Sequence, residues 1–240
     1  MTLEERMRQY ESVRRHTFIR RMPVIIRVDG NSFSSFTKNY KNEIKDNADV
    51  QYGFSVKLND ALIYGAQLGL DIQCVKCAYI QSDEISFLLT DFDNLDTEPP
   101  FGYICDKIIS IFSTRVANGF NYALHPYSMF EFADFLTKAN NFPEDEVTNY
   151  FVWRQQDAIR NSLSKFARYF FSHKELENKN SSDMHEMLYT KGKNWATDLP
   201  DRFKNGVFIT REKIFDNCPI FKTDRNEIEK LMVKNYTYSN

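Results

Sequence analysis

The chain lacks an excess of charge of either sign. Its 240 residues include 31 lysines and arginines against 33 aspartates and glutamates, and the formal net charge is −2. The overall charge therefore gives no indication of nucleic-acid binding. Any binding of a polyanion must use a local patch of basic residues.

Cysteine and histidine are too few and too scattered to predict a zinc site. The four cysteines include one Cys-x-x-Cys pair, Cys74 and Cys77, and the four histidines form no closely spaced pair. A structural zinc needs four ligands, and no second pair completes the set. We therefore expect buried or half-buried thiols.

Long apolar runs are missing as well. No segment approaches the roughly 20 apolar residues that cross a bilayer, and no signal-peptide pattern opens the chain. We expect a soluble, cytoplasmic protein without a membrane partner.

The chain is nevertheless rich in core material, with 42% hydrophobic residues, 21 Phe and 13 Tyr. That is enough for one large domain or a domain with an elaborated subdomain. The periodicity predicts an α+β fold, in which a small antiparallel sheet carries helices mainly on one face. Strands are expected at 24–28, 77–80, 85–89 and 206–210, helices at 2–15, 31–36, 48–68, 101–118, 129–138 and 144–170, a polar loop at 37–47, and a loosely attached helix in the last twenty residues.

Two acidic turns end strongly apolar runs. Asp29 follows the run 24–28, and Asp83 lies between the runs 77–80 and 85–89. A carboxylate at the rim of a buried strand costs solvation energy unless a cation or a hydrogen-bond donor satisfies it. Each aspartate alone is typical of a turn, but two on neighbouring strands suit a pair of Mg²⁺ ions that also hold phosphates. The pair predicts phosphoryl or nucleotidyl transfer.

Two residues next to these aspartates also bear on metal binding. The backbone carbonyl of Gly30 is a suitable further oxygen ligand, and Glu84 competes with Asp83. Alternation along the hairpin puts Asp83 and Glu84 on opposite faces, so only one of them should bind metal directly.

Two groups of basic residues leave two interpretations open. Lys38, Lys41 and Lys45 follow the first acidic turn, either as a solvated loop or as a clamp on a triphosphate. Backbone amides of residues 31–34, at the start of a helix, could cradle phosphate in the same place.

The long helix carries the second group, either as a solvated face or as a track for an RNA backbone. Its polar residues fall at three- and four-residue spacings and so line one side. Trp153 and Phe166 are expected in the core rather than as base-stacking residues. The polar positions are Arg154, Asp157, Asn161, Lys165 and Arg168.

Three blocks resemble the tRNA-His guanylyltransferase superfamily, in order and at fitting spacing, between about residues 20 and 212. Residues 27–33 (Arg-Val-Asp-Gly-Asn-Ser-Phe) resemble its RxDGxxF signature. Residues 81–87 (Gln-Ser-Asp-Glu-Ile-Ser-Phe) resemble its second element, and residues 153–157 (Trp-Arg-Gln-Gln-Asp) with Asn161 resemble its third.

Two departures refine the resemblance. Residues 158–161 (Ala-Ile-Arg-Asn) replace the His-Ile-Asn-Asn run of the eukaryotic enzymes, and Ser34 stands where a histidine is usual. Residues 160–162, 171–176 and 189–192 resemble instead the bacterial and archaeal guanylyltransferase-like proteins, which are template-dependent 3′-to-5′ polymerases that repair 5′-truncated tRNAs.

The resemblance implies a palm domain like that of polymerases and cyclases over residues 1–140. Residues 141–240 would form a mainly helical extension with a closing strand, packed as part of one catalytic unit. It also implies a homotetramer, two Mg²⁺ ions, GTP or another NTP and ATP as substrates, and tRNA or a tRNA-like RNA as partner.

The same resemblance implies the site residues. Asp29 and Asp83 would be catalytic and, with Gly30, would bind metal. The residues implied for nucleotide binding are Asn31, Ser32, Phe33, Ser34, Lys41, Lys45, Ser82, Lys191 and Asn194, and those for RNA binding are Arg154, Arg160, Asn161, Lys165 and Arg168.

The expected activity is template-directed 3′-to-5′ nucleotidyl transfer to the 5′ end of truncated tRNA, after ATP or GTP activates that end. One alternative is a tRNA-His guanylyltransferase that adds a single G at position −1, against which the missing histidine argues. A second is a non-catalytic RNA-binding homologue, against which the two retained aspartates argue. A palm-fold nucleotide cyclase leaves the third block unexplained.

Overall fold

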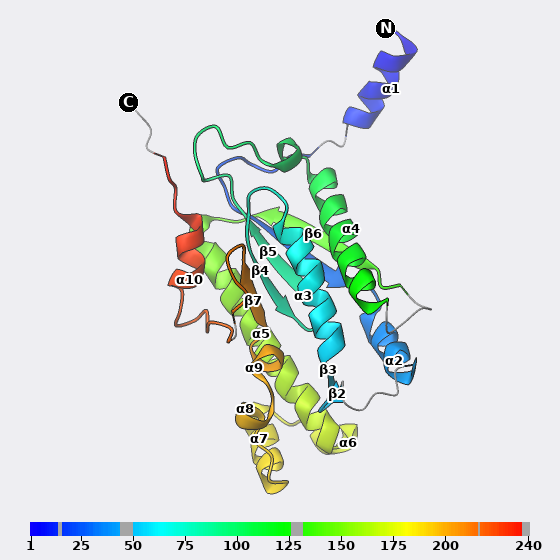
Figure 1. Cartoon of the computed structure of the whole chain (residues 1–240), viewed down its shortest axis with the longest axis vertical. Helices are drawn as coiled ribbons and strands as arrows, with labels where there is room; N and C mark the ends of the chain where they lie inside the picture. The colour runs from blue at the N-terminus through cyan, green and yellow to red at the C-terminus, as the bar shows by residue number, and fades with distance from the viewer. Residues whose placement is uncertain (14–15, 44–49, 126–131, 216, 237–240) are drawn as a thin grey trace.

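A five-stranded antiparallel sheet forms the centre of the computed structural model, which describes residues 1–13, 16–43, 50–125, 132–215 and 217–236. The strand order is β6-β1-β5-β4-β7 (Figure 1). The strands are β1 (Val24–Gly30), β4 (Val75–Gln81), β5 (Glu84–Leu89), β6 (Phe135–Asn141) and β7 (Val207–Thr210), and a separate pair comprises β2 (Val50–Gln51) and β3 (Phe54–Ser55).

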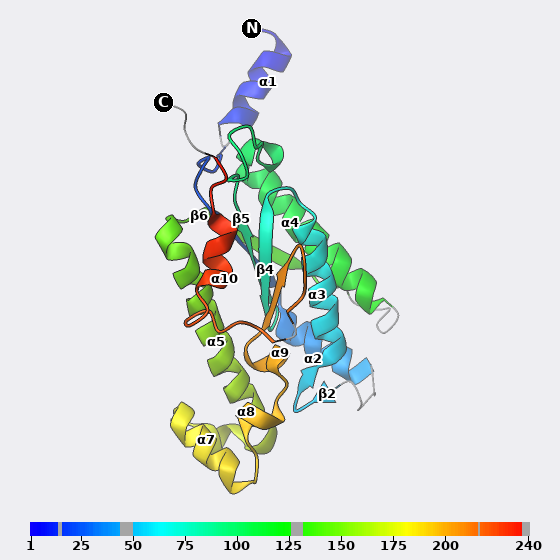
Figure 2. The same cartoon turned by 60° about the vertical axis from the view of Figure 1, so that its left-hand side comes forward.

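Helices cover both faces of this sheet (Figures 1 and 2). The helices are α1 (Leu3–Ser12), α2 (Phe33–Glu43), α3 (Val56–Leu70), α4 (Cys105–Leu124), α5 (Glu144–Phe170), α6 (His173–Leu176), α7 (Ser181–Thr190), α8 (Trp195–Asp198), α9 (Asp201–Lys204) and α10 (Asn226–Glu229), with short 3₁₀ helices η1 (Pro100–Tyr103) and η2 (Lys230–Met232). The α+β class with a small antiparallel sheet is confirmed.

One face of the sheet is packed by α3 and α4. Side chains such as Ile26 and Phe87 point into this layer and are fully buried. The two helices approach closely because glycines face each other: a Cβ on Gly65 would lie 2.8 Å from the carbonyl oxygen of Val116. A Cβ on Gly119 would likewise lie 2.8 Å from the Cα of Gly65.

The opposite face is packed by α5 and the C-terminal segment, so the expectation of helices mainly on one face is wrong. Tyr79 and Leu88 point into this second layer, where they meet Phe151 of α5. Phe221 and Ile228 are fully buried in the same cluster. The segment around α10 is therefore anchored by apolar packing and is not loosely attached.

Two local predictions are also wrong. The helix expected over 129–138 is replaced, in its described part, by β6, in which buried Phe135 alternates with outward-facing Leu136 and pairs with Gly30 of β1. The loop expected over 37–47 is helical as far as Glu43, because Phe33, Phe36 and Tyr40 form one buried stripe on α2.

Both halves of the chain build the same sheet. β6 spans the predicted division at residue 140, and β7, from the second half, pairs with β4. The helical module α6–α8 extends from the far end of α5, away from the sheet (Figure 1).

Candidate active site

Asp29 and Asp83 lie at the ends of adjacent strands, as their positions after apolar runs predicted. Asp29 pairs with Glu84 in the β1–β5 register, and Asp83 occupies the two-residue turn between β4 and β5. The N–H of Gly30 donates to the carbonyl oxygen of Asp83 at 3.1 Å, which ties the two turns together. The sheet thus brings two carboxylates to one edge.

The surroundings of Asp83 disfavour the charged form of its carboxyl group. Burial raises the pKa of the Asp83 carboxyl above its ordinary value of 3.8, and the neighbouring charge of Asp29 raises it further. In the described part of the chain, the salt bridges around this edge go to Glu84 and Asp157 and not to the two aspartates. Two adjacent acids without a cationic side chain fit a divalent cation.

The remaining ligands of such a cation would come from elsewhere. Within the described residues there is no group of three or more His, Cys, Asp or Glu side chains that could hold a metal. Mg²⁺ is commonly bound by one or two carboxylates, with water and substrate phosphates completing the shell. Asp29, Asp83 and the carbonyl of Gly30 fit that pattern.

Glu84 points away from this edge into the α5 layer. Its carboxylate is buried and accepts two hydrogen bonds from Arg154, from Nε at 2.7 Å and from Nη2 at 2.8 Å. The prediction that Asp83 and Glu84 lie on opposite faces stays a prediction, and the structure shows that Glu84 is engaged by Arg154. Arg154 is only 7% exposed, so it does not lie on the exposed helix face where the periodicity predicted it, because Glu84 requires its charge.

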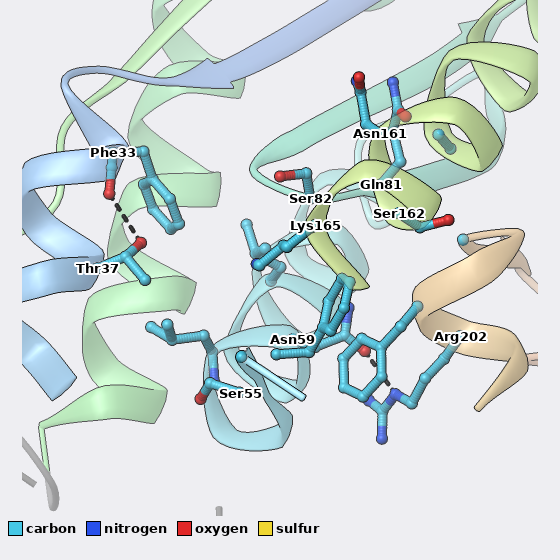
Figure 3. Close-up of a pocket in the computed structure, with 17 residues that line it drawn as sticks. Phe33, Thr37, Ser55, Asn59, Gln81, Ser82, Asn161, Ser162, Lys165 and Arg202 are labelled. Atoms are coloured by element: carbon cyan, nitrogen blue, oxygen red, sulfur yellow. Dashed lines mark hydrogen bonds between the residues drawn. The ribbon is translucent and has the colours of Figure 1, made fainter. Parts of the chain in front are cut away.

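A cavity opens beside the Asp83 turn, between α2, α3, α5 and α9 (Figure 3). Its empty volume, including space open to solvent, is ≈ 770 Å³. Phe33 and Ser82, expected to bind nucleotide, line it together with Asn161 and Lys165, which were expected to bind RNA. The structure therefore joins residues from both predicted sets in one site.

The cavity also contains residues that sequence reasoning missed. Phe54 and Phe203 stack with ring centroids 5.1 Å apart, and Lys165 Nζ lies 4.3 Å from the centroid of Phe54. The guanidinium of Arg202 donates from Nε to Asn59 Oδ1 at 2.5 Å. Asn59 is a polar residue between Leu58 and Leu62 in the helix expected over 48–68, and its position there was an available signal.

Several predicted nucleotide-binding residues lie outside this cavity. The N–H of Asn31 donates to the carbonyl oxygen of Asp134 at 2.8 Å, and Ser32 and Ser34 are exposed at the start of α2. Lys191 ends α7 and Asn194 caps α8 by accepting from the N–H of Ala196, so both belong to the helical module. Lys45 and the side chain of Lys41 lie outside the described residues.

The other predicted RNA-binding residues are exposed along α5. Arg160 donates to Asp157 Oδ1 at 2.9 Å, and Arg168 lies two turns further along. Cys74, Cys77 and Cys218 are buried and Cys105 half-buried, as expected of ordinary thiols. Across the described ranges, no helix is long and apolar enough to span a membrane.

Comparison with known proteins gives concordant matches. A family model described as tRNAHis guanylyltransferase matches residues 4–145. A bacterial tRNA(HIS) guanylyltransferase (Thg1)-like protein in complex with ATP superposes with a TM-score of 0.88 at 35% identity, over 96% of this chain and 99% of that chain. One in complex with GTP gives 0.79 at 30% identity over the same shares, 96% and 99%.

More distant matches extend the likeness. The tRNA(His) guanylyltransferase from Saccharomyces cerevisiae has a TM-score of 0.75 at 18% identity, over 92% of this chain and 97% of that chain, which shows the shared fold. An uncharacterized protein of Acanthamoeba polyphaga mimivirus is 22% identical over 214 residues, 79% of this chain and 70% of that protein.

Proposed function

The chain belongs to the tRNAHis guanylyltransferase family, and from this premise we propose that it is a nucleotidyltransferase acting on the 5′ end of tRNA or a tRNA-like RNA. More specifically, it extends a truncated 5′ end in the 3′-to-5′ direction against a template strand. The observation that carries the proposal is the placement of Asp29 and Asp83 at adjacent strand ends, beside a cavity that Ser82 of the same turn lines.

The cavity supports an NTP site next to these acids. The aromatic rings of Phe54 and Phe203 offer an apolar surface for a base, and Asn161 offers polar contacts. Lys165 brings a positive charge suited to phosphate oxygens. The relatives of known structure that carry ATP and GTP support the same assignment.

The acids supply the reaction centre. Asp29 and Asp83, with the carbonyl of Gly30, would hold two Mg²⁺ ions, and the hydrogen bond from Gly30 to Asp83 fixes their relative positions. Bound Mg²⁺ would lower the pKa of an attacking hydroxyl and neutralise charge on the leaving group. Lys165 and Asn161 would orient the NTP so that its 3′-hydroxyl faces the RNA 5′ end, which ATP or GTP has first activated where it carries a monophosphate.

Addition of a single G to tRNA-His is the second candidate. The family model that matches residues 4–145 is described as tRNAHis guanylyltransferase, which is a specific observation in its favour. The higher identity to the bacterial (Thg1)-like proteins, and the Ala-Ile-Arg-Asn sequence at 158–161, support the polymerase instead.

An extension assay tests the proposal. The substrate is 5′-monophosphorylated tRNA that lacks its first nucleotide, with Mg²⁺, ATP and all four NTPs. We expect the templated nucleotide to be restored. A single G added to full-length tRNA-His alone would favour the second candidate, and no product on either RNA would contradict both.

Matched carboxylate variants test the acids. Asp29→Asn and Asp83→Asn should each lower the rate about 10³-fold, because metal stabilisation of the transition state is worth several kcal/mol and each 1.4 kcal/mol is tenfold. Asp96→Asn, in an exposed loop, is the control and should keep the wild-type rate. Substantial activity in Asp29→Asn or Asp83→Asn, with folding verified by circular dichroism, would contradict the two-metal assignment.

The assembly and the location complete the proposal. We expect a homotetramer in the cytoplasm, as the resemblance implies. Light scattering coupled to size exclusion tests the tetramer, since a monomeric mass at working concentrations would contradict it.

A further inference from the structure

Trp153 is exposed on α5, contrary to the expectation that it lies in the core. It keeps 51% of its surface accessible, although burial of a tryptophan side chain is a large source of stability. The reason for this exposure is not a loose side chain, because two neighbours hold the ring.

The indole is braced by residues that are themselves fixed. Its ring meets that of Tyr150 edge-on at 5.8 Å, and the guanidinium of Arg154 lies over it at 4.6 Å. The hydroxyl of Tyr150 is hydrogen-bonded to Ser86 Oγ at 3.0 Å. Arg154 is held by Glu84 through two hydrogen bonds. The ring is therefore a rigid aromatic surface that is partly open to solvent.

This surface is linked directly to the reaction centre. Three consecutive residues of the β4–β5 hairpin have different roles. Ser82 lines the cavity, and Asp83 provides one of the two carboxylates. Glu84 binds Arg154, which lies behind Trp153. Trp153 does not line the cavity, whereas Asn161 and Lys165, further along α5, do. The hairpin that carries Asp83 thus contacts the cavity through Ser82 and the arginine behind Trp153 through Glu84.

Cationic residues lie on the sheet face that α5 covers and on α5 itself. Arg27 on β1 pairs in register with Lys138 on β6, and alternation puts Arg27 on the same sheet face as Ile25, which packs under α5. Arg160 lies two helical turns from Trp153 and its side chain is 63% exposed. Aromatic rings beside cations are what single-stranded RNA requires, since bases stack on the rings and phosphates meet the charges. Protein partners favour apolar surroundings with few lysines.

We propose that Trp153 is the platform on which a terminal base of the RNA substrate stacks, with Arg27 and Lys138 contacting the adjacent phosphates. The proposal deepens the proposed function and rests on it for the identity of the RNA. Its specific content is that the RNA end, and not the NTP, occupies this surface. The reacting 5′ end is then held on one side of the acids while the NTP enters from the other.

Fluorescence separates the two ligands because the chain has only two tryptophans, Trp153 and Trp195. In a Trp195→Phe variant, Trp153 is the sole tryptophan, and 5′-monophosphorylated tRNA lacking its first nucleotide should quench it. GTP alone should leave it unchanged. In the reciprocal Trp153→Phe variant, Trp195 remains, and its indole N–H donates to Ser162 of the cavity wall, so GTP rather than tRNA should alter its emission.

Affinity measurements give the magnitude. Trp153→Ala should weaken tRNA binding about 5- to 100-fold, as loss of one stacked base does, and should leave GTP affinity unchanged. Trp153→Phe should recover part of the loss. Tyr122→Ala, which removes an aromatic ring that is 74% exposed on α4, is the control and should bind tRNA as the wild type does.

Each other outcome overturns the inference in a recognisable way. Unchanged tRNA affinity in a folded Trp153→Ala variant refutes the platform while leaving the proposed function intact. A change of molecular mass in that variant assigns the surface to a second copy of the chain. Quenching of Trp153 by GTP assigns it to the NTP, and absence of tRNA binding by the wild type refutes the proposed function and the platform together.

Discussion

Arg154 should be required for stability rather than for contact with RNA, and Arg154→Met tests this. The guanidinium is held between Glu84 and Asp157, at 2.7 Å and 3.1 Å. Removing it would leave the buried Glu84 carboxylate with Arg27, whose Nε is 3.8 Å away, and the weak donors Gln81 and Ser86. Breaking a buried ion pair from one side costs about 3–5 kcal/mol, because the remaining charge is uncompensated.

The loss of the ion pair would be large compared with the total free energy of unfolding. Domains unfold with about 5–15 kcal/mol, so roughly a fifth or more of the stability would disappear. With a urea dependence of about 2–3 kcal/mol per molar, the unfolding midpoint should fall by roughly 1–2 M. Urea titration followed by circular dichroism measures this shift. Arg160→Met is the control, since its pair with Asp157 is exposed and should contribute about 0–1 kcal/mol.

The double variant Glu84→Gln with Arg154→Met distinguishes a lost pair from lost packing. Methionine retains much of the arginine's apolar bulk, and glutamine leaves no uncompensated charge in the interior. The double variant should therefore be more stable than Arg154→Met alone, with a coupling energy of about 1–3 kcal/mol. If Arg154→Met is no more costly than Arg160→Met, Arg154 is not needed to neutralise Glu84, and its predicted role on an RNA track returns.

Two further predictions concern the acid pair and the helix layer. Because burial and the charge of Asp29 raise the folded pKa of Asp83 above 3.8, the contribution of Asp83 to stability is fully present below pH 3.8 and is lost as pH rises through the folded pKa. In thermal melts at pH 7, Asp83→Asn should therefore raise Tm without metal, and Mg²⁺ should raise Tm of the wild type only. Gly65→Ala would place a methyl 2.8 Å from the Val116 carbonyl oxygen and should cost about 1–3 kcal/mol in urea unfolding, whereas exposed Gln67→Ala on the same helix should cost less than about 0.5 kcal/mol.

The elements that sequence reasoning located are those with strong periodicity and full burial. β1, β4 and β5 are nearly continuous apolar runs, and α3, α4 and α5 carry apolar residues at helical spacing. Each acidic turn follows such a run, so the positions of Asp29 and Asp83 could be read from the chain. Their proximity could then be inferred, because neighbouring antiparallel strands place the end of one beside the turn of the next.

The elements that it missed depend on partners far away in sequence. β6 is an edge strand with one buried and one exposed face, and its polar ending at Asn140 and Asn141 gives little strand signal. Only its pairing with β1 makes it extended. In α2, the polar residues between the aromatic residues concealed the stripe formed by Phe33, Phe36 and Tyr40, which is buried only because the sheet and α4 lie beneath it.

Trp153 and Arg154 show why the site was harder to predict than the fold. Adjacent residues on a helix point about 100° apart, so periodicity fixes a stripe but not which of its flanks meets the sheet. Hydrophobicity alone would bury the tryptophan and expose the arginine. The reverse arrangement follows from Glu84, which enters the interior because Asp83 takes the turn and alternation sends the next side chain inward. A buried carboxylate requires a cation, and in α5 the nearest turn supplies Arg154. If each buried charge had first been paired with a counter-charge, and helix faces assigned by hydrophobicity only afterwards, the sequence would have predicted that Trp153 is exposed to solvent.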